Sequence, residues 1–182
     1  MRSIRETALA FARACAAAKI RYALVGGFAV MAWGQPRMTL DVDALVAVDA
    51  KAAASLQDAC RNEGLRVSIE DIQSAIAEGS HVTVFDEQSP YHVDAKLART
   101  AFELSEINEA KRITFSDGEL VIARPEDTIA FKLVYGSPQD LQDARSILIR
   151  QKGVVNLDQL RALAVRLGVE KSLERLLDEA QA

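Results

Sequence analysis

The sequence is poor in cysteine, has no long apolar run and shows no excess of basic residues. Its two cysteines, Cys15 and Cys60, lie in separate apolar helical patterns. One disulfide could join them, but two buried thiols in a reducing cytoplasm are the simpler interpretation. No segment approaches the roughly 18 consecutive apolar residues of a membrane-spanning helix. Charged residues at Arg2, Arg5 and Glu6 precede an alanine-rich stretch, which is typical of an amphipathic helix and not of a secretion signal. We therefore expect a cytoplasmic protein with no membrane association.

The charge balance also limits the class of partner. The 182 residues include 22 Lys and Arg against 26 Asp and Glu, which gives a net charge of −4. Proteins that bind extended nucleic acid usually show a clear basic excess. Extended DNA binding is therefore not expected, whereas contact with a tRNA end stays open. Hydrophobic residues make up 49% and charged residues 26%, which is ordinary for a globular protein and too apolar for disorder.

Apolar periodicity and turn residues divide the chain into two parts. Residues 1–123 mix helical and alternating patterns, which predicts an α+β core, and residues 124–182 read as a helical subdomain that begins near Pro125. Strands are expected at 22–25, 41–48, 65–69, 81–85, 92–97, 112–115 and 120–123. Helices are expected at 4–18, 28–33, 51–63, 72–77, 125–135, 138–150, 156–166 and 170–180, with 102–109 open between helix and loop. The Asp117-Gly118 pair predicts a hairpin between the last two strands.

Three aspartates in alternating apolar segments are the strongest chemical signal. Asp41 and Asp43 are two residues apart on an expected strand, so their side chains project from one face. Adjacent carboxylates repel each other unless one is protonated or a cation lies between them. Asp94, between Val93 and Ala95, has the same setting on another expected strand. The three acids could hold two divalent ions about 3.5–4 Å apart for phosphoryl displacement, although an exposed sheet face could carry the same residues.

A glycine pair precedes the first two acids. Gly26 and Gly27 end an apolar segment and open a helical pattern, so the backbone can approach a ligand and free N–H groups can point at an anion. This layout would cradle the β- and γ-phosphates of a nucleotide. A Gly-Gly pair alone is common in turns. The order is more informative: a strand, Gly-Gly, a short helix, Arg37-x-Thr39, and then Asp-x-Asp on the next strand.

In this order the chain resembles the nucleotidyltransferase superfamily that includes DNA polymerase β, and in particular a stand-alone bacterial group related to AbiEii-type toxins. The resemblance extends over about residues 20–150. The residues that carry it are Gly26, Gly27, Arg37, Thr39, Asp41, Asp43, Asp94 and Lys132. It implies a nucleotidyltransferase-like mixed β-sheet flanked by helices and followed by a small C-terminal helical part.

The resemblance also implies an activity. The protein would move a nucleoside monophosphate from an NTP, such as ATP, to a hydroxyl of RNA, protein or a small molecule, and release pyrophosphate. Asp41, Asp43 and Asp94 would be catalytic and would bind two Mg²⁺ or Mn²⁺ ions. The nucleotide-binding residues would be Gly26, Gly27, Arg37, Thr39 and Lys132. Asp140 and Asp143 share a helical face, and we expect them to pair with Lys132 or Arg145 and not to bind metal.

Two other functions stay open. A catalytically weak or inactive binding module of the same fold, such as a toxin–antitoxin component, would use its acidic surface for a protein partner. Three mutually repelling carboxylates argue against a mere scaffold. A metal-dependent phosphohydrolase also uses acid clusters. We expect His81 and His92 at ordinary strand or surface positions away from the acids, which argues against that reaction.

Overall fold

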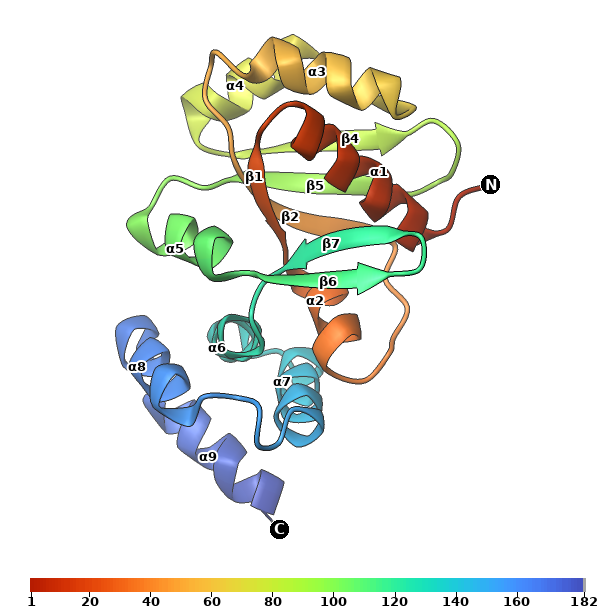
Figure 1. The fold of residues 1–182 in the computed structure, drawn as a ribbon. Helices are drawn as coiled ribbons and strands as arrows, with labels where there is room; N and C mark the ends of the chain where they lie inside the picture. The colour runs from red at the N-terminus through yellow and green to blue at the C-terminus, as the bar shows by residue number, and fades with distance from the viewer. Residues whose placement is uncertain (182) are drawn as a thin grey trace.

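The computed structural model describes residues 1–181, which form one seven-stranded mixed sheet with helices packed against it (Figure 1). The strands are β1 (Arg21–Leu24), β2 (Asp41–Ala47), β3 (Leu65–Arg66), β4 (His81–Asp86), β5 (His92–Leu97), β6 (Lys111–Phe115) and β7 (Gly118–Ile122). Their order in the sheet is β3-β4-β5-β2-β1-β7-β6. The pairs β2–β5 and β1–β7 are parallel and the other pairs are antiparallel.

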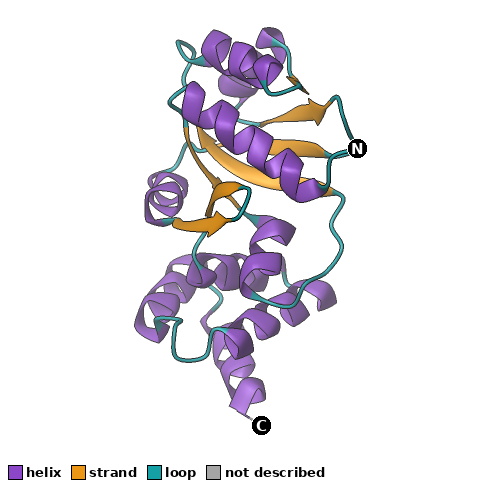
Figure 2. Ribbon diagram, turned by 45° about the vertical axis from the view of Figure 1, so that its right-hand side comes forward, coloured by secondary structure: helices purple, strands orange, loops and turns teal. Residues whose placement is uncertain are grey.

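The helices come from the whole length of the described chain. They are α1 (Ile4–Ala17), α2 (Gly26–Trp33), α3 (Ala53–Asn62), α4 (Ile69–Glu78), α5 (Ala101–Glu109), α6 (Pro125–Tyr135), α7 (Pro138–Arg150), α8 (Leu157–Leu167) and α9 (Glu170–Gln181). The strands lie together in one half of the molecule and α6 to α9 in the other (Figure 2). A mixed sheet flanked by helices and followed by helices confirms the predicted α+β fold.

Apolar residues and aspartates alternate along the start of β2, so one face of the strand packs in the main core and the other face points away from it. Val42, Ala44 and Val46 are buried in the large cluster that contains α1, α3 and α4. Their neighbours on the strand, Asp41 and Asp43, therefore point to the other face. The main core thus fixes which face of the sheet carries the acids.

Local capping residues explain where some elements differ from the sequence prediction. The strand at 65–69 is cut to two residues because the Ser68 hydroxyl accepts the backbone N–H of Asp71 and starts α4 earlier. Residues 101–109 are a helix, and Thr100 and Glu103 form its capping box. The helix expected at 28–33 begins at Gly26, so both glycines lie in its first turn.

The C-terminal helices have a hydrophobic cluster of their own. Ile129, Ile147 and Leu160 are fully buried in it, and Val30 of α2 belongs to the same cluster. Trp33, also in α2, donates its indole N–H to the carbonyl of Ala123 at 2.7 Å. Helix α2 therefore joins the two halves. The boundary between residues 123 and 124 stays a prediction.

Two further sequence predictions concern the cysteines and the membrane. Cys15 and Cys60 are both free and buried, as expected for thiols that pack in the core. No helix among residues 1–181 combines the length and apolar character needed to cross a bilayer.

Candidate functional site

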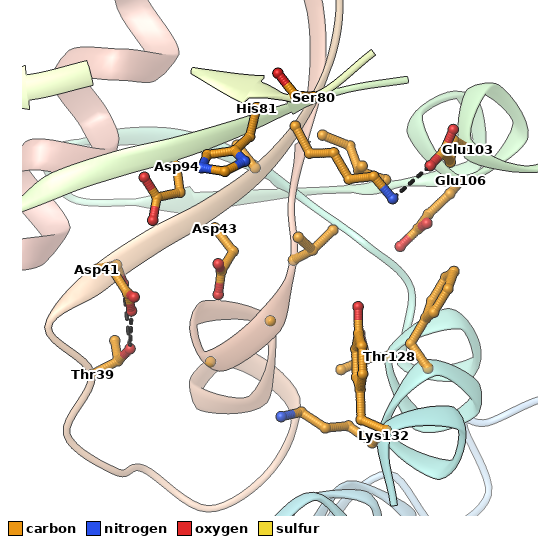
Figure 3. A pocket seen from close by; sticks show the side chains of 18 of the residues that line it. Thr39, Asp41, Asp43, Ser80, His81, Asp94, Glu103, Glu106, Thr128 and Lys132 are labelled. Carbon is orange, nitrogen blue, oxygen red and sulfur yellow. Dashed lines mark hydrogen bonds and ion pairs between the residues drawn. The ribbon is translucent and has the colours of Figure 1, made fainter. Parts of the chain in front are cut away.

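The parallel pairing of β2 and β5 brings the three predicted aspartates together. The register sets Asp43 beside Asp94 and Asp41 beside His92. Residues two apart on a strand share a face, and paired residues on neighbouring strands project the same way. All three carboxylates therefore lie on one face of the sheet, at the same side of a cavity (Figure 3).

Two threonine hydroxyls orient the outer carboxylates. Thr39 Oγ1 donates to Asp41 Oδ1 at 2.9 Å, and Thr83 Oγ1 donates to Asp94 Oδ1 at 2.7 Å. Thr83 is the register partner of Asp94 on β4, and no local sequence pattern indicates a role for it at the site. These bonds fix the rotamers of two acids while leaving their second oxygens free for other contacts.

The acids repel one another. Burial raises the pKa of Asp43, and the nearby Asp41 and Asp94 carboxylates raise it further. The backbone N–H of Gly27 and the charge of Lys132 act in the opposite direction. A cation between these acids would relieve the repulsion, and carboxylate oxygens are the ligands that Mg²⁺ and Mn²⁺ accept. The donor set therefore fits a divalent ion.

His92 lies against these acids, and the expectation that no histidine would do so was wrong. His92 Nε2 is 3.6 Å from Asp94 Oδ2. One ligand atom each from Asp41, His92 and Asp94 lie within 4.8 Å of one another. The pattern His92-x-Asp94 was visible in the sequence with the same spacing as Asp41-x-Asp43. Its closeness to Asp41 depends on strand register, which the local pattern does not contain.

The glycine turn is closely packed against the same side chains. Gly26 has φ +56°, and a Cβ built there would lie 2.0 Å from Asp43 Oδ2. A Cβ on Gly27 would lie 3.0 Å from Thr39 Oγ1 and 3.2 Å from a guanidinium nitrogen of Arg37. Side chains at these positions would therefore collide with the site. The pair lets the N-terminal turn of α2 approach the carboxylates.

Two basic residues reach the cavity and are held by acids of α7. Lys132 Nζ is 2.6 Å from Asp140 Oδ1 and 3.0 Å from Asp143 Oδ2, which confirms the predicted pairing. Arg37 Nε lies 3.2 Å from Asp143 Oδ1. Burial opposes the charge of Lys132, but its bonds to the two acids outweigh burial and raise its pKa. Lys132 therefore stays protonated at neutral pH.

The cavity has a volume of about 640 Å³, which is in the range of small-molecule sites. All eight residues that the sequence analysis proposed for the site line it: Gly26, Gly27, Arg37, Thr39, Asp41, Asp43, Asp94 and Lys132. Its other end is formed by α5 and α6 with Glu103, Glu106, Thr128, Phe131 and Tyr135.

Glu106 is the least expected member of this lining. Its side chain is only 3% exposed. Burial raises its pKa to about 8, and the charges of Asp127 and Glu103 act in the same direction. Lys96 and Arg124 lower it by less. A glutamate in an amphipathic helical pattern carries no sequence signal of such burial.

Replacing Glu106 by Gln is expected to stabilise the protein at high pH. Since the pKa of Glu106 is near 8 in the folded protein and 4.5 for an ordinary glutamate, the folded state holds the extra proton between these values, and stability falls as pH rises through that window. Gln does not titrate, so the advantage of Glu106→Gln should grow from pH 4.5 to pH 8, to an order of magnitude of about 4 kcal/mol. Urea unfolding at pH 4.5, 6.5 and 8.5 measures this. A constant difference between variant and wild type would contradict it.

Comparison with solved structures identifies proteins of similar fold, whereas comparison of sequences does not find a match. No protein-family model matches the chain, and no curated protein matches its sequence. The solution structure of the antibiotic-resistance factor ANT(2'')-Ia is 16% identical, with a TM-score of 0.56 and coverage of 100% of this chain and 98% of that chain. The crystal structure of ANT(2'')-Ia in complex with adenylyl-2''-tobramycin is 15% identical, with a TM-score of 0.56 and coverage of 86% and 92%.

A third solved structure is similar as well. The antigenic nucleotidyltransferase-like protein from Paracoccidioides brasiliensis is 18% identical, with a TM-score of 0.52, and the match covers 94% of this chain and 92% of that chain. At these identities the likeness concerns the fold alone. Membership in the AbiEii-related group stays a prediction. The chain has the fold of the nucleotidyltransferase structures that it resembles.

Proposed function

We propose that this protein is a metal-dependent nucleotidyltransferase, which moves a nucleoside monophosphate from an NTP to a hydroxyl acceptor and releases pyrophosphate. The observation that carries the proposal is the parallel register of β2 and β5, which sets Asp94 beside Asp43, whose carboxylate packs against Gly26. The fold that the chain shares with ANT(2'')-Ia supports it. One of those structures holds an adenylylated tobramycin.

The site residues would have distinct roles in this reaction. Asp41, Asp43 and Asp94 would hold two Mg²⁺ or Mn²⁺ ions, which neutralise triphosphate charge as pyrophosphate leaves. Gly26 and Gly27 would let phosphate oxygens approach the backbone at the start of α2, where the N–H of Gly27 also contacts Asp43.

The remaining residues would handle charge and the proton. Arg37 and Lys132 would add positive charge at the phosphates, and their partner acids on α7 would keep them in place. The acceptor oxygen forms a bond to the α-phosphorus while the bond to the β-phosphate oxygen breaks. Asp94 would accept the proton of the acceptor hydroxyl.

Different observations bear on the two alternative functions. A binding module without catalysis gains no support, because the full set of acids faces a cavity. For a phosphohydrolase, the argument from missing histidine no longer holds, since His92 lies 3.6 Å from Asp94. The likeness of fold to nucleotidyltransferases favours transfer, and the products of the reaction distinguish the two.

A labelling experiment tests the proposal. The protein is incubated with each of the four α-³²P-labelled NTPs, with Mg²⁺ or with EDTA, and with cell extract or tobramycin as the acceptor. We expect label on an acceptor, together with pyrophosphate, only when Mg²⁺ is present. Asp94→Asn should lose this labelling, and Asp71→Asn, an exposed acid on α4, should keep it. Release of inorganic phosphate without labelled acceptor would indicate a hydrolase instead.

His92 predicts a metal preference that can be measured without any reaction. Imidazole favours Mn²⁺ over Mg²⁺, which prefers oxygen ligands. Replacing His92 by Asn is therefore expected to weaken Mn²⁺ binding about ten-fold or more, with little change for Mg²⁺. Calorimetry and Mn²⁺ electron paramagnetic resonance on the nucleotide-free protein measure both affinities.

His81→Asn is the matched control for this prediction. His81 lines the same cavity with its ring on the side of Asp94 (Figure 3), but it does not belong to the group of Asp41, His92 and Asp94 whose ligand atoms lie within 4.8 Å of one another. An equal effect of the two substitutions, or an unchanged Mn²⁺ affinity in His92→Asn, would mean that His92 is not a ligand.

A further inference from the structure

The end of the cavity between α5 and α6 contains a buried carboxyl group without a partner. Oε2 of Glu106 is buried and receives no hydrogen bond from any described residue. Arg37 Nε and Asp143 Oδ2 also lack hydrogen bonds, but each lies within 3.2 Å of an opposite charge. Glu106 has no such ion pair within the described chain. Figure 3 shows its side chain extending from α5 with the carboxyl directed into the cavity.

The polar groups around Glu106 are already used by other partners. Lys96 Nζ bonds Glu103 Oε1 at 2.8 Å. The guanidinium of Arg124 bonds Asp127 and Glu109, each at 2.8 Å. The Thr128 hydroxyl donates to the carbonyl of Arg124 at 2.9 Å.

A ligand in the cavity is therefore the natural source of a donor for Glu106. A buried carboxyl group without a hydrogen-bond partner is unfavourable. An amino group of a ligand can donate to Oε2 of Glu106 in either protonation state, and a charged amine would also favour the ionised carboxylate. A carbonyl group can be bound only by the protonated form, so an amino group would be preferred. The nearby Asp127 and Glu103 charges make the position more favourable for a positive or N–H-rich group. The half-buried ring of Phe131 and the exposed ring of Tyr135 also line this end, and aromatic faces attract amino groups and flat rings.

We propose that Glu106 recognises an amino group of the ligand and thereby selects which ligand occupies this end of the cavity. The inference rests on the proposed function, because that function provides two sources of such a group. One is the exocyclic amine of the NTP base, and the other is an amine on the acceptor. The shared chemistry is an N–H donor bound by the Glu106 carboxyl.

Matched ligand pairs that differ at one nitrogen test this proposal and distinguish the sources. ATP against ITP and CTP against UTP each compare an amino group with a carbonyl on the base, in the presence of Mg²⁺. Glucosamine against glucose compares an amine with a hydroxyl on a sugar acceptor. Calorimetry measures the nucleotides, and saturation-transfer NMR measures the weaker sugars.

If the base is the source, the wild type should prefer at least one amino base over its partner by about ten-fold or more. Glu106→Leu should abolish that ratio. If the acceptor is the source, Glu106→Leu should leave both nucleotide ratios unchanged and should lose the preference for glucosamine. Glu106→Gln, which keeps the size and an acceptor oxygen, should have a smaller effect in either case.

Ser105→Ala on the same helix is the control, because Ser105 is exposed and does not line the cavity. Thermal unfolding of each variant verifies that it folds. Unchanged ratios for all three ligand pairs in a folded Glu106→Leu protein would overturn the proposal for Glu106 alone. If the wild type binds neither nucleotide nor sugar, both this inference and the proposed function are wrong.

Discussion

Replacing Asp43 by Asn is expected to lower nucleotidyl transfer by about 1,000-fold, while the metal-free protein becomes more stable. A metal ligand contributes several kcal/mol to transition-state stabilisation, and each 1.4 kcal/mol is about ten-fold in rate. Stability should rise because burial and the Asp41 carboxylate disfavour the charged form of Asp43. Asn keeps the size of the side chain and an oxygen that can accept the N–H of Gly27.

The sign of the stability effect can be tested by its pH dependence. The pKa of Asp43 is raised above 3.8 in the folded protein, so the wild type loses stability as pH rises above that value. The advantage of Asp43→Asn should therefore be present at pH 7 in EDTA and disappear under acidic conditions. Melting curves in EDTA and the labelling assay in Mg²⁺ provide the two measurements.

Exposed Asp71→Asn serves as the control and should change neither property. Retained transfer by Asp43→Asn would show that its carboxylate is not needed for the reaction. Loss of both transfer and stability would indicate that the substitution disrupts the fold, and the loss of transfer would then say nothing about metal binding.

Replacing Gly26 by Ala is expected to abolish metal-dependent nucleotide binding and to destabilise the protein. Two separate effects combine here. The φ of +56° disfavours any side chain, and the new Cβ would lie 2.0 Å from Asp43 Oδ2. Backbone strain alone amounts to about 1–2 kcal/mol. The collision adds to it and displaces the Asp43 carboxylate.

Gly168→Ala separates these effects. Gly168 has φ +70° and a Cβ there would meet nothing within 4 Å, so this variant carries the strain without the collision. Denaturant unfolding should show a larger loss for Gly26→Ala than for Gly168→Ala, and only the former should lose nucleotide binding in calorimetry. Equal losses of stability with nucleotide binding intact would mean that Asp43 moves aside without consequence.

Local sequence patterns were sufficient to predict most of the helices and strands and to identify the three aspartates as candidate site residues. Asp41 and Asp43 alternate with apolar residues, so their shared face follows from the geometry of a single strand. The helix at 101–109 was ambiguous because its hydrophobic pattern is weak. The Thr100 and Glu103 capping box that stabilises it was present in the sequence but was not recognised.

Other features required the folded chain because they depend on contacts between distant segments. The placement of His92 beside Asp41 follows from the register of β2 and β5. The 50 residues between them contain no pattern that predicts this pairing. The burial of Glu106 depends on the packing of α5 against β1 and β2, with α6 lining the same cavity. A helical glutamate usually faces solvent, so the sequence pattern favoured the opposite interpretation.

Local sequence patterns specify the succession of strands and helices, the shared face of Asp41 and Asp43, and the glycines that allow close approach. These properties arise from backbone geometry and from side chains a few residues apart. Contacts between distant segments set which strands are neighbours. They bring His92 to the acids and enclose Glu106 without a partner among the residues that the structure describes. Strand pairing and desolvation depend on segments that are remote in the chain, so no local pattern could specify them.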